Sequence, residues 1–176
     1  TRISIIKAFF FVLPLLNLRM IRFAHHPQFI TITNLNWLPV LESNHHKQIL
    51  VEALSKRVEK EMVTIYGFVI MPNHFHAIWQ LHDGISRVDF QRDLLKFTAR
   101  SLLHFMLMND NPILNQLQVK AADRNYQVWE RNSLSVDLFS EKVFFQKLDY
   151  IHANPLQEKW SLAKLPEEYR WSSASY

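Results

Sequence analysis

Two histidines separated by one residue have the spacing of a metal-binding pair. His74 and His76 lie in the string MPNHFHAIW. We predict a strand over residues 74–81, and side chains two apart on a strand point to the same face of a sheet. Both imidazoles can then reach one ion, and imidazole suits zinc, manganese and other borderline ions. The spacing alone is a weak signal, because two solvent-facing strand histidines produce the same pattern.

The composition limits the other chemistry that the chain can perform. It contains no cysteine, which excludes disulfides, thiolate zinc sites and cysteine nucleophiles. Any metal must therefore be held by histidine, carboxylate, amide or water. The two glycines, Gly67 and Gly84, are too few for a P-loop or a dinucleotide-binding fingerprint. Nucleoside-triphosphate chemistry is excluded on the same grounds.

Charge and length describe a basic globular protein. The 176 residues carry a formal net charge of +4, and nine histidines add cationic capacity. A polyanionic partner is consistent with this balance, and so is an ordinary basic soluble protein. Because 48% of the residues are hydrophobic and 20% are charged, we expect an ordered fold, and the length suits one domain.

The first nineteen residues differ from the rest of the chain. Their apolar run, residues 5–16, is shorter than the roughly 20 residues that a membrane-spanning helix needs. We interpret residues 1–19 as an extension ahead of a natural start at Met20, with a targeting segment as the alternative. Residues 20–176 are then expected to form a single domain.

The remaining sequence alternates between strand-like and helix-like patterns. Strands are expected from residue 28 and at residues 63–71, 74–81 and 126–130, and helices at residues 42–61, 86–108 and 140–153. Ser140, and either Ser43 or Asn44, are expected to cap two of these helices. The order β, α, β, β, α, β, α predicts an α+β fold of the ferredoxin-like (RRM-like) kind, an antiparallel sheet with helices on one face.

Four strings of the sequence carry a resemblance to a known family: YGFVIMPNHFHAIWQ, LLKFTARSL, LDYIHANPLQEKW and YRWSSASY. They resemble the bacterial transposases that have an HUH histidine pair and one catalytic tyrosine, and they look most like the REP-associated branch. The resemblance extends from about residue 28 to the end of the chain. It implies Mg²⁺ or Mn²⁺ as cofactor, single-stranded or hairpin DNA as partner, and a possible homodimer. It also implies a cytoplasmic, nucleoid-associated protein that does not enter a membrane.

In that family the nucleophile is the tyrosine before an I-x-x-N-P string, which here is Tyr150. A phenol can form a stable link to phosphate when a metal polarises the phosphate, and a core tyrosine is the alternative. Related transposases have a glutamine metal ligand four residues after the tyrosine, where this chain has Asn154. Asn154 is thus a candidate third ligand or an ordinary helix cap. His152 is a second choice, which should point away from Tyr150.

Basic and aromatic residues are candidates for a DNA-binding surface. A cationic stripe with a spacing of four residues on a predicted helix consists of Arg92, Lys96 and Arg100. It would contact phosphates or form an ordinary solvated helix face. Arg131, Trp79 and Trp129 can stack on unpaired bases, although such tryptophans are more often core residues.

These assignments predict a metal-dependent transposase. Tyr150 would attack a backbone phosphate, form a 5′-phosphotyrosine bond and release a 3′-hydroxyl, and the 3′-hydroxyl of a second strand would reverse the step. Because the phosphotyrosine retains the bond energy, no ATP is required. Two other functions stay open. One is a non-catalytic RRM-like module that binds nucleic acid by shape and stacking, and the other is a metal-dependent hydrolase that activates water.

Overall fold

A computed structural model describes residues 25–175, so the predicted extension at residues 1–19 lies outside the described residues. Within this range the strands are β1 (Gln28–Thr33), β2 (Val63–Ile70), β3 (His74–Leu81), β4 (Gln118–Ala121), β5 (Arg124–Tyr126) and β6 (Leu134–Asp137). The α-helices are α2 (Asn44–Glu59), α3 (Arg87–Met108) and α4 (Glu141–Ala153). Two short 3₁₀ helices are η1 (Leu35–Trp37), which follows β1, and η3 (Asn154–Leu156), which follows α4.

The central sheet has the strand order β2-β3-β1-β6, and each neighbouring pair is antiparallel. Strands β2 and β3 are joined by the turn predicted at Pro72 and Asn73. Strand β1 pairs with β3 only after the chain has passed through α2 and β2, which is the crossover of a split βαβ unit. The element order and the sheet confirm the predicted ferredoxin-like α+β fold.

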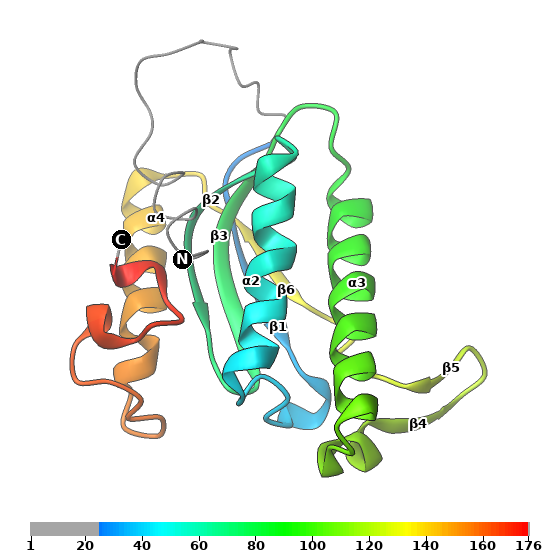
Figure 1. Ribbon diagram of the computed structural model, residues 1–176. Helices are drawn as coiled ribbons and strands as arrows, with labels where there is room; N and C mark the ends of the chain where they lie inside the picture. The colour runs from blue at the N-terminus through cyan, green and yellow to red at the C-terminus, as the bar shows by residue number, and fades with distance from the viewer. Residues whose placement is uncertain (1–24, 176) are drawn as a thin grey trace.

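The two faces of the sheet are covered by different helices. Helices α2 and α3 share one face, as predicted, and there Trp79 of β3 packs against Phe90 of α3 with ring centroids 5.4 Å apart. Helix α4 packs against β2 and β3 from the other side, so the sheet lies between helices in Figure 1. The expectation of helices on one face therefore holds for α2 and α3. Helix α4 covers the opposite face, where apolar side chains such as Phe29 also need cover.

A glycine allows α4 to approach the sheet closely. Gly67 of β2 is buried, and a Cβ atom at this position would clash with the Leu148 side chain of α4. The hydroxyl of Ser173 also reaches this part of β2 and accepts a hydrogen bond from Phe68 N at 2.9 Å. Because β2 has no side chain at Gly67, the helix packs directly on the strand backbone.

Each of the three α-helices between residues 25 and 175 begins at a serine N-cap. The hydroxyl groups of Ser43, Ser86 and Ser140 accept hydrogen bonds from backbone N–H groups three residues later, at 3.1, 3.3 and 3.3 Å. Such a cap satisfies one of the N–H groups that the first helical turn leaves unpaired. The three helix starts predicted from the sequence are confirmed to within two residues.

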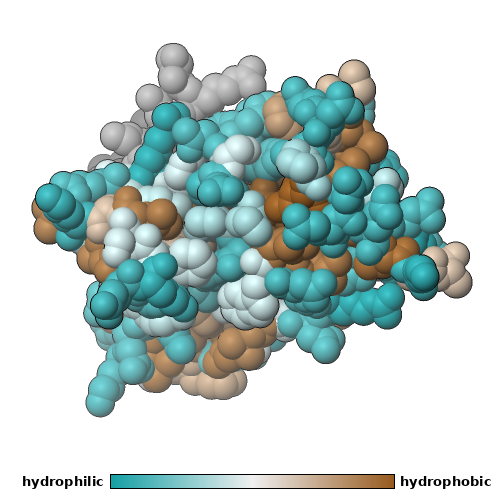
Figure 2. Space-filling model, turned by 90° about the horizontal axis from the view of Figure 1, so that it is seen from below, coloured by the Kyte–Doolittle hydropathy of each residue, from teal (hydrophilic) through white to brown (hydrophobic). Residues whose placement is uncertain are grey.

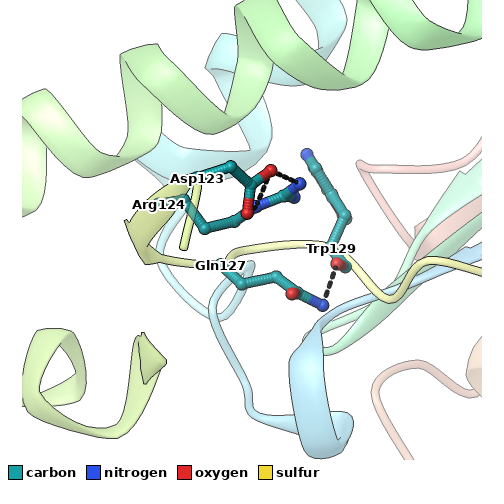
Figure 3. A network of polar contacts seen from close by, with 4 residues as sticks. All are labelled: Asp123, Arg124, Gln127 and Trp129. Atoms are coloured by element: carbon teal, nitrogen blue, oxygen red, sulfur yellow. Dashed lines mark hydrogen bonds and ion pairs between the residues drawn. The ribbon is translucent and has the colours of Figure 1, made fainter. Parts of the chain in front are cut away.

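The fourth strand of the sheet is not the predicted one. Strand β6 pairs with β1. Of the predicted residues 126–130, Tyr126 ends β5, which pairs with β4, and Trp129 makes an isolated bridge to Asn34. The Gln127 side chain donates to the Trp129 carbonyl at 3.0 Å, which occupies an acceptor that a strand neighbour would use (Figure 3). The prediction is wrong because β6 is a four-residue strand, too short for a period-two pattern to stand out.

The C-terminal segment is fixed to the edge of β2. Ile70 N donates to the Trp171 carbonyl at 2.8 Å, and the Tyr169 hydroxyl donates to the Ile70 carbonyl at 2.8 Å. An isolated antiparallel bridge joins Val69 to Ser172. These bonds pair backbone groups that an edge strand would otherwise expose.

Figure 2 shows the end of the molecule that lies at the bottom of Figure 1. Hydrophobic residues reach the surface there in separate patches, with hydrophilic residues between them. This is the end at which β2 turns into β3 (Figure 1), and His74 is the first residue of β3. Between residues 25 and 175, no helix combines the length and the apolar character needed to cross a membrane.

Candidate active site

His74 and His76 lie side by side on one face of β3. Their ring centroids are 4.7 Å apart, and each residue is only 4% exposed. Phe75, which lies between them, points to the opposite face, as the alternation of a strand requires. The predicted common face is confirmed, and the alternative of two solvent-facing histidines is wrong.

Hydrogen bonds fix the orientation of His74. Its Nδ1 atom lies 2.7 Å from Asn73 Oδ1, and Asn73 Nδ2 donates to the Trp37 carbonyl at 3.2 Å. Because an amide oxygen only accepts, His74 Nδ1 must carry the proton, and Nε2 retains its lone pair. An outer hydrogen bond of this kind commonly holds a metal-binding histidine in one tautomer.

His76 is held by the neighbouring strand β1. Thr31 is its partner in the ladder, and Thr31 Oγ1 lies 2.8 Å from His76 Nδ1. Phe29 stacks on the imidazole with ring centroids 5.3 Å apart. The other ring nitrogen, Nε2, is buried and has no hydrogen-bond partner among residues 25–175. A buried polar atom without a partner is costly, which favours a site that a ligand completes.

Both histidines are neutral at physiological pH. Burial lowers the pKa of His74 to about 4, and the positive charge of Lys159 acts in the same direction. Burial lowers the pKa of His76 to about 3, and His74, Lys147 and Lys159 lower it further, against a hydrogen bond to the Ile30 backbone. Neutral imidazole is the form that binds a metal ion.

Tyr150 of α4 lies against the histidine pair. Its ring centroid is 5.3 Å from that of His76 and 6.0 Å from that of Phe29. The residue is 42% exposed, so the alternative of a buried core tyrosine is wrong. A phenol at the boundary between the imidazoles and solvent can contact a bound substrate and the two imidazoles at once.

Two lysines that were not among the candidate site residues lie at the same site. Lys147 Nζ lies 5.7 Å from the Tyr150 ring, and Lys159 Nζ lies 5.4 Å from the Trp160 ring. Trp160 in turn packs beside His74, with ring centroids 5.8 Å apart. Lys147 precedes Tyr150 by three residues on one helix, a spacing that could have identified it, whereas Lys159 is placed only by the fold. Both charges favour an anion such as phosphate.

Asn154 follows Tyr150 by one helical turn and is 2% exposed. Its backbone forms the C-cap of α4, while its side-chain Oδ1 has no hydrogen-bond partner in the described part of the chain. The cap and ligand interpretations are therefore compatible, because an amide oxygen is a suitable ligand for Mg²⁺ or Mn²⁺. His152 Nε2 lies 2.9 Å from Ser173 Oγ, so this side chain points elsewhere, as expected.

The residues at the histidine pair can form part of a metal site. Among residues 25–175, no group of three or more His, Cys, Asp and Glu side chains could hold an ion. A metal at His74 and His76 would therefore need amide, water or phosphate oxygens to complete its shell. Two neutral imidazoles fit Mg²⁺ or Mn²⁺ under that condition, and the unpaired amide oxygen of Asn154 stays a candidate third ligand.

A solved structure shares this fold. The structure of a REP-associated tyrosine transposase bound to a REP hairpin aligns with a TM-score of 0.64 and 18% identity, over 92% of this chain and 84% of that one. This chain has the fold of a REP-associated tyrosine transposase. A candidate transposase from Deinococcus radiodurans R1 aligns with a TM-score of 0.47 and 15% identity, over 78% of this chain and 95% of that one. No protein-family model and no curated protein matches the sequence.

The predicted cationic stripe lies across the sheet from the histidine pair. It is exposed on α3 and consists of Arg92, Lys96 and Arg100. Arg92 bonds Asp89 at 2.6 Å and Asp93 at 3.1 Å, which neutralises part of its charge. Arg131 is exposed in the segment before β6. The contact of these four residues with DNA stays a prediction.

Trp79 and Trp129 are core residues, so the prediction that they stack on bases is wrong. They are 2% and 6% exposed, and both side chains point toward α3. Trp129 Nε1 donates to Thr98 Oγ1 of that helix at 3.1 Å. An exposed tryptophan does lie at the site, but it is Trp37, which the sequence does not distinguish from any other loop residue.

Proposed function

We propose that this protein is a transposase that cleaves and rejoins single-stranded or hairpin DNA with Tyr150 as the nucleophile. The observation that carries the proposal is the approach of Tyr150 to His76 within one chain, with ring centroids 5.3 Å apart. The fold shared with a REP-associated tyrosine transposase bound to a REP hairpin supports the choice of substrate. His76 and Tyr150 meet within a single chain, so the proposed cleavage uses the histidines and the tyrosine of the same copy.

The residues divide the chemistry between them. His74 and His76 would hold Mg²⁺ or Mn²⁺, with Asn154 as a candidate third ligand. When bound, the metal polarises the scissile phosphate. The Tyr150 hydroxyl gives up its proton to solvent, and its oxygen bonds to phosphorus as the bond to the 3′ oxygen breaks. The leaving oxygen takes a proton from water, and the 3′-hydroxyl of another strand later displaces Tyr150 in the reverse sense.

The positive charges of Lys147 and Lys159 favour binding of the negatively charged DNA backbone at this site. Lys147 lies beside the nucleophile and lowers the pKa of His76 by its charge, which places it near the metal-binding nitrogen atoms. A phosphate bound there would be stabilised by both lysines and oriented by groups that are already fixed. Electrostatic stabilisation of the charge that develops on the phosphate follows from this arrangement.

A covalent-adduct assay tests the proposal. A hairpin oligonucleotide with a fluorophore at its 3′ end, together with Mn²⁺, should give labelled protein on a denaturing gel. The label stays with the protein because a 5′-phosphotyrosine retains the downstream DNA. Tyr150→Phe and His76→Ala should abolish the adduct. Tyr126→Phe is the matched control, since Tyr126 lies on β5, and it should retain the adduct.

The same assay separates the two alternative functions. A metal-dependent hydrolase would cut the DNA without an adduct, and Tyr150→Phe would leave the cutting intact. A non-catalytic module would shift the hairpin on a native gel and leave it uncut. Either result would overturn the proposed function.

A further inference from the structure

Trp37 presents its indole beside the histidine pair. The residue is 59% exposed, and its ring centroid lies 5.8 Å from that of His74. Tryptophan is on average one of the most buried residues, and one that remains open beside buried imidazoles offers a flat aromatic surface at the site. Every nucleobase has a face that can stack on such a surface.

The backbone at this position is held in an unusual conformation. Asn36 and Trp37 have φ angles of 51° and 59°, in the left-handed region that bulky residues seldom adopt. Trp37 N donates to the Asn34 carbonyl at 3.0 Å, and Asn36 N donates to the Glu130 side chain at 2.7 Å. Strain of this kind persists where the surroundings impose it, and it often accompanies a functional position. The turn therefore fixes the direction of the indole.

The same turn also supports His74. The Trp37 carbonyl accepts a hydrogen bond from Asn73 Nδ2, and the other atom of that amide, Oδ1, accepts from His74 Nδ1. The indole and the imidazole thus share one set of contacts, which sets the position of the aromatic surface relative to the proposed phosphate site. Trp160 packs beside His74 as well, and Lys159 Nζ lies 5.4 Å from the Trp160 ring.

We propose that Trp37 stacks on a base next to the cleaved phosphate and thereby determines which phosphate reaches Tyr150. The inference rests on the proposed function and adds a positioning and specificity role to it. A phosphate at the histidines leaves its neighbouring base free to reach the indole, whereas the core tryptophans Trp79 and Trp129 are not accessible. Stacking of this kind tolerates any base, so it selects a position along the strand more than the identity of the base.

The experiment measures binding without cleavage. Hairpin oligonucleotides carry 2-aminopurine at successive positions around the cleaved phosphate and are bound in Mn²⁺ to Tyr150→Phe protein, which does not cut. One position should show quenched fluorescence from stacking. Adding Trp37→Asn should restore that fluorescence and weaken binding by about 5- to 150-fold. Asparagine tolerates the left-handed backbone, so this variant removes the ring and leaves the turn in place.

Two further variants complete the test. Trp37→Phe keeps an aromatic ring and should recover part of both the quenching and the affinity. Phe97→Ala removes an exposed aromatic from α3, across the sheet, and should change neither. The inference is overturned if adding Trp37→Asn leaves the quenching at every position as it is in the Tyr150→Phe protein. It is also overturned if Trp37→Phe and Trp37→Asn lose equal affinity with no change in quenching.

The two proposals can fail separately. A wild-type adduct combined with unchanged quenching in Trp37→Asn would remove the stacking role and leave the proposed function in place. Quenching that depends on Trp37, without an adduct from the wild-type protein, would show a DNA-binding site that does not cleave. Thermal unfolding of each variant checks that the fold is retained.

Discussion

The side chains of β3 form two rows, one on each face of the sheet. Both rows are buried, but only one of them has all its contacts within the protein. Phe75 and Trp79 point to α2 and α3 and are surrounded by apolar groups, so their contacts are complete in the folded chain. His74 and His76 point to α4, and His76 Nε2 has no partner within residues 25–175. The row with Phe75 and Trp79 therefore contributes to the stability of the fold, while the row with His74 and His76 keeps a nitrogen atom that can still bind a ligand. The predictions below test that difference.

The largest expected difference is between the effects of substituting Phe75 and His76 on the free energy of unfolding. Phe75→Ala should lower the free energy of unfolding by about 3–5 kcal/mol, because it leaves a cavity in the core. His76→Ala should lower it by less than about 2 kcal/mol, because burying the unpaired Nε2 already costs stability. Urea denaturation measures both values. Equal losses would contradict the distinction between the two rows.

A divalent metal should stabilise the protein through the histidine row. At a Mn²⁺ concentration 100 times the dissociation constant, the gain is about 2.7 kcal/mol if the metal binds only the folded chain. Thermal unfolding with Mn²⁺ and then with EDTA measures the gain. His74→Ala and His76→Ala should lose it and Arg92→Ala should keep it. Persistence of the gain in both histidine variants would show that the metal binds elsewhere.

Acid should destabilise the metal-free protein through the same two imidazoles. In the unfolded chain they take up protons near pH 6.5, but the folded-state pKa values are about 4 for His74 and about 3 for His76. Stability is thus highest above pH 6.5 and falls toward these lower values, by about 1–2 kcal/mol per histidine at pH 5. His74→Asn and His76→Asn should each flatten the decline in Tm. An unchanged slope would mean that the histidines are not desolvated as the structure indicates.

The smallest expected change in stability follows from removing the contact between Thr31 of β1 and His76. Thr31→Val removes the hydroxyl beside Nδ1, and the expected loss is about 0.5–1.5 kcal/mol in stability and about 10- to 100-fold in Mn²⁺ affinity. Thr64→Val is the matched control, since it removes a similar contact with His82 at 2.8 Å outside the site. Calorimetric titration with Mn²⁺ compares the two. A similar loss of metal affinity in both variants would argue against a specific role for Thr31.

The parts of the fold with a strong local signal could be predicted from the sequence. Serine caps and three- and four-residue apolar spacing locate the long helices, and Pro72 and Asn73 mark the hairpin that carries the histidines. The alternation of a strand is enough to place His74 and His76 on one face. Tyr150 could be chosen because the string around it resembles a family, since an amphipathic helix alone would suit a core tyrosine equally well.

The missed parts depend on contacts between distant segments. Strand β6 is too short to show a pattern and forms because β1 offers a free edge. Trp79 and Trp129 look suitable for stacking until the fold places α3 over them. Trp37 becomes a candidate site residue only because the tertiary structure places it beside His74. Local spacing predicts which residues share an element, whereas packing decides which surfaces remain open.

The close contact of Gly67 with Leu148 has a consequence for the time at which the protein becomes competent. The histidine strand is translated well before α4. A nascent chain that has not yet reached residue 140 holds the imidazoles but lacks Tyr150, the proposed nucleophile. Under the proposed function such a chain has no group to attack DNA, and it becomes competent only when α4 packs onto the backbone at Gly67.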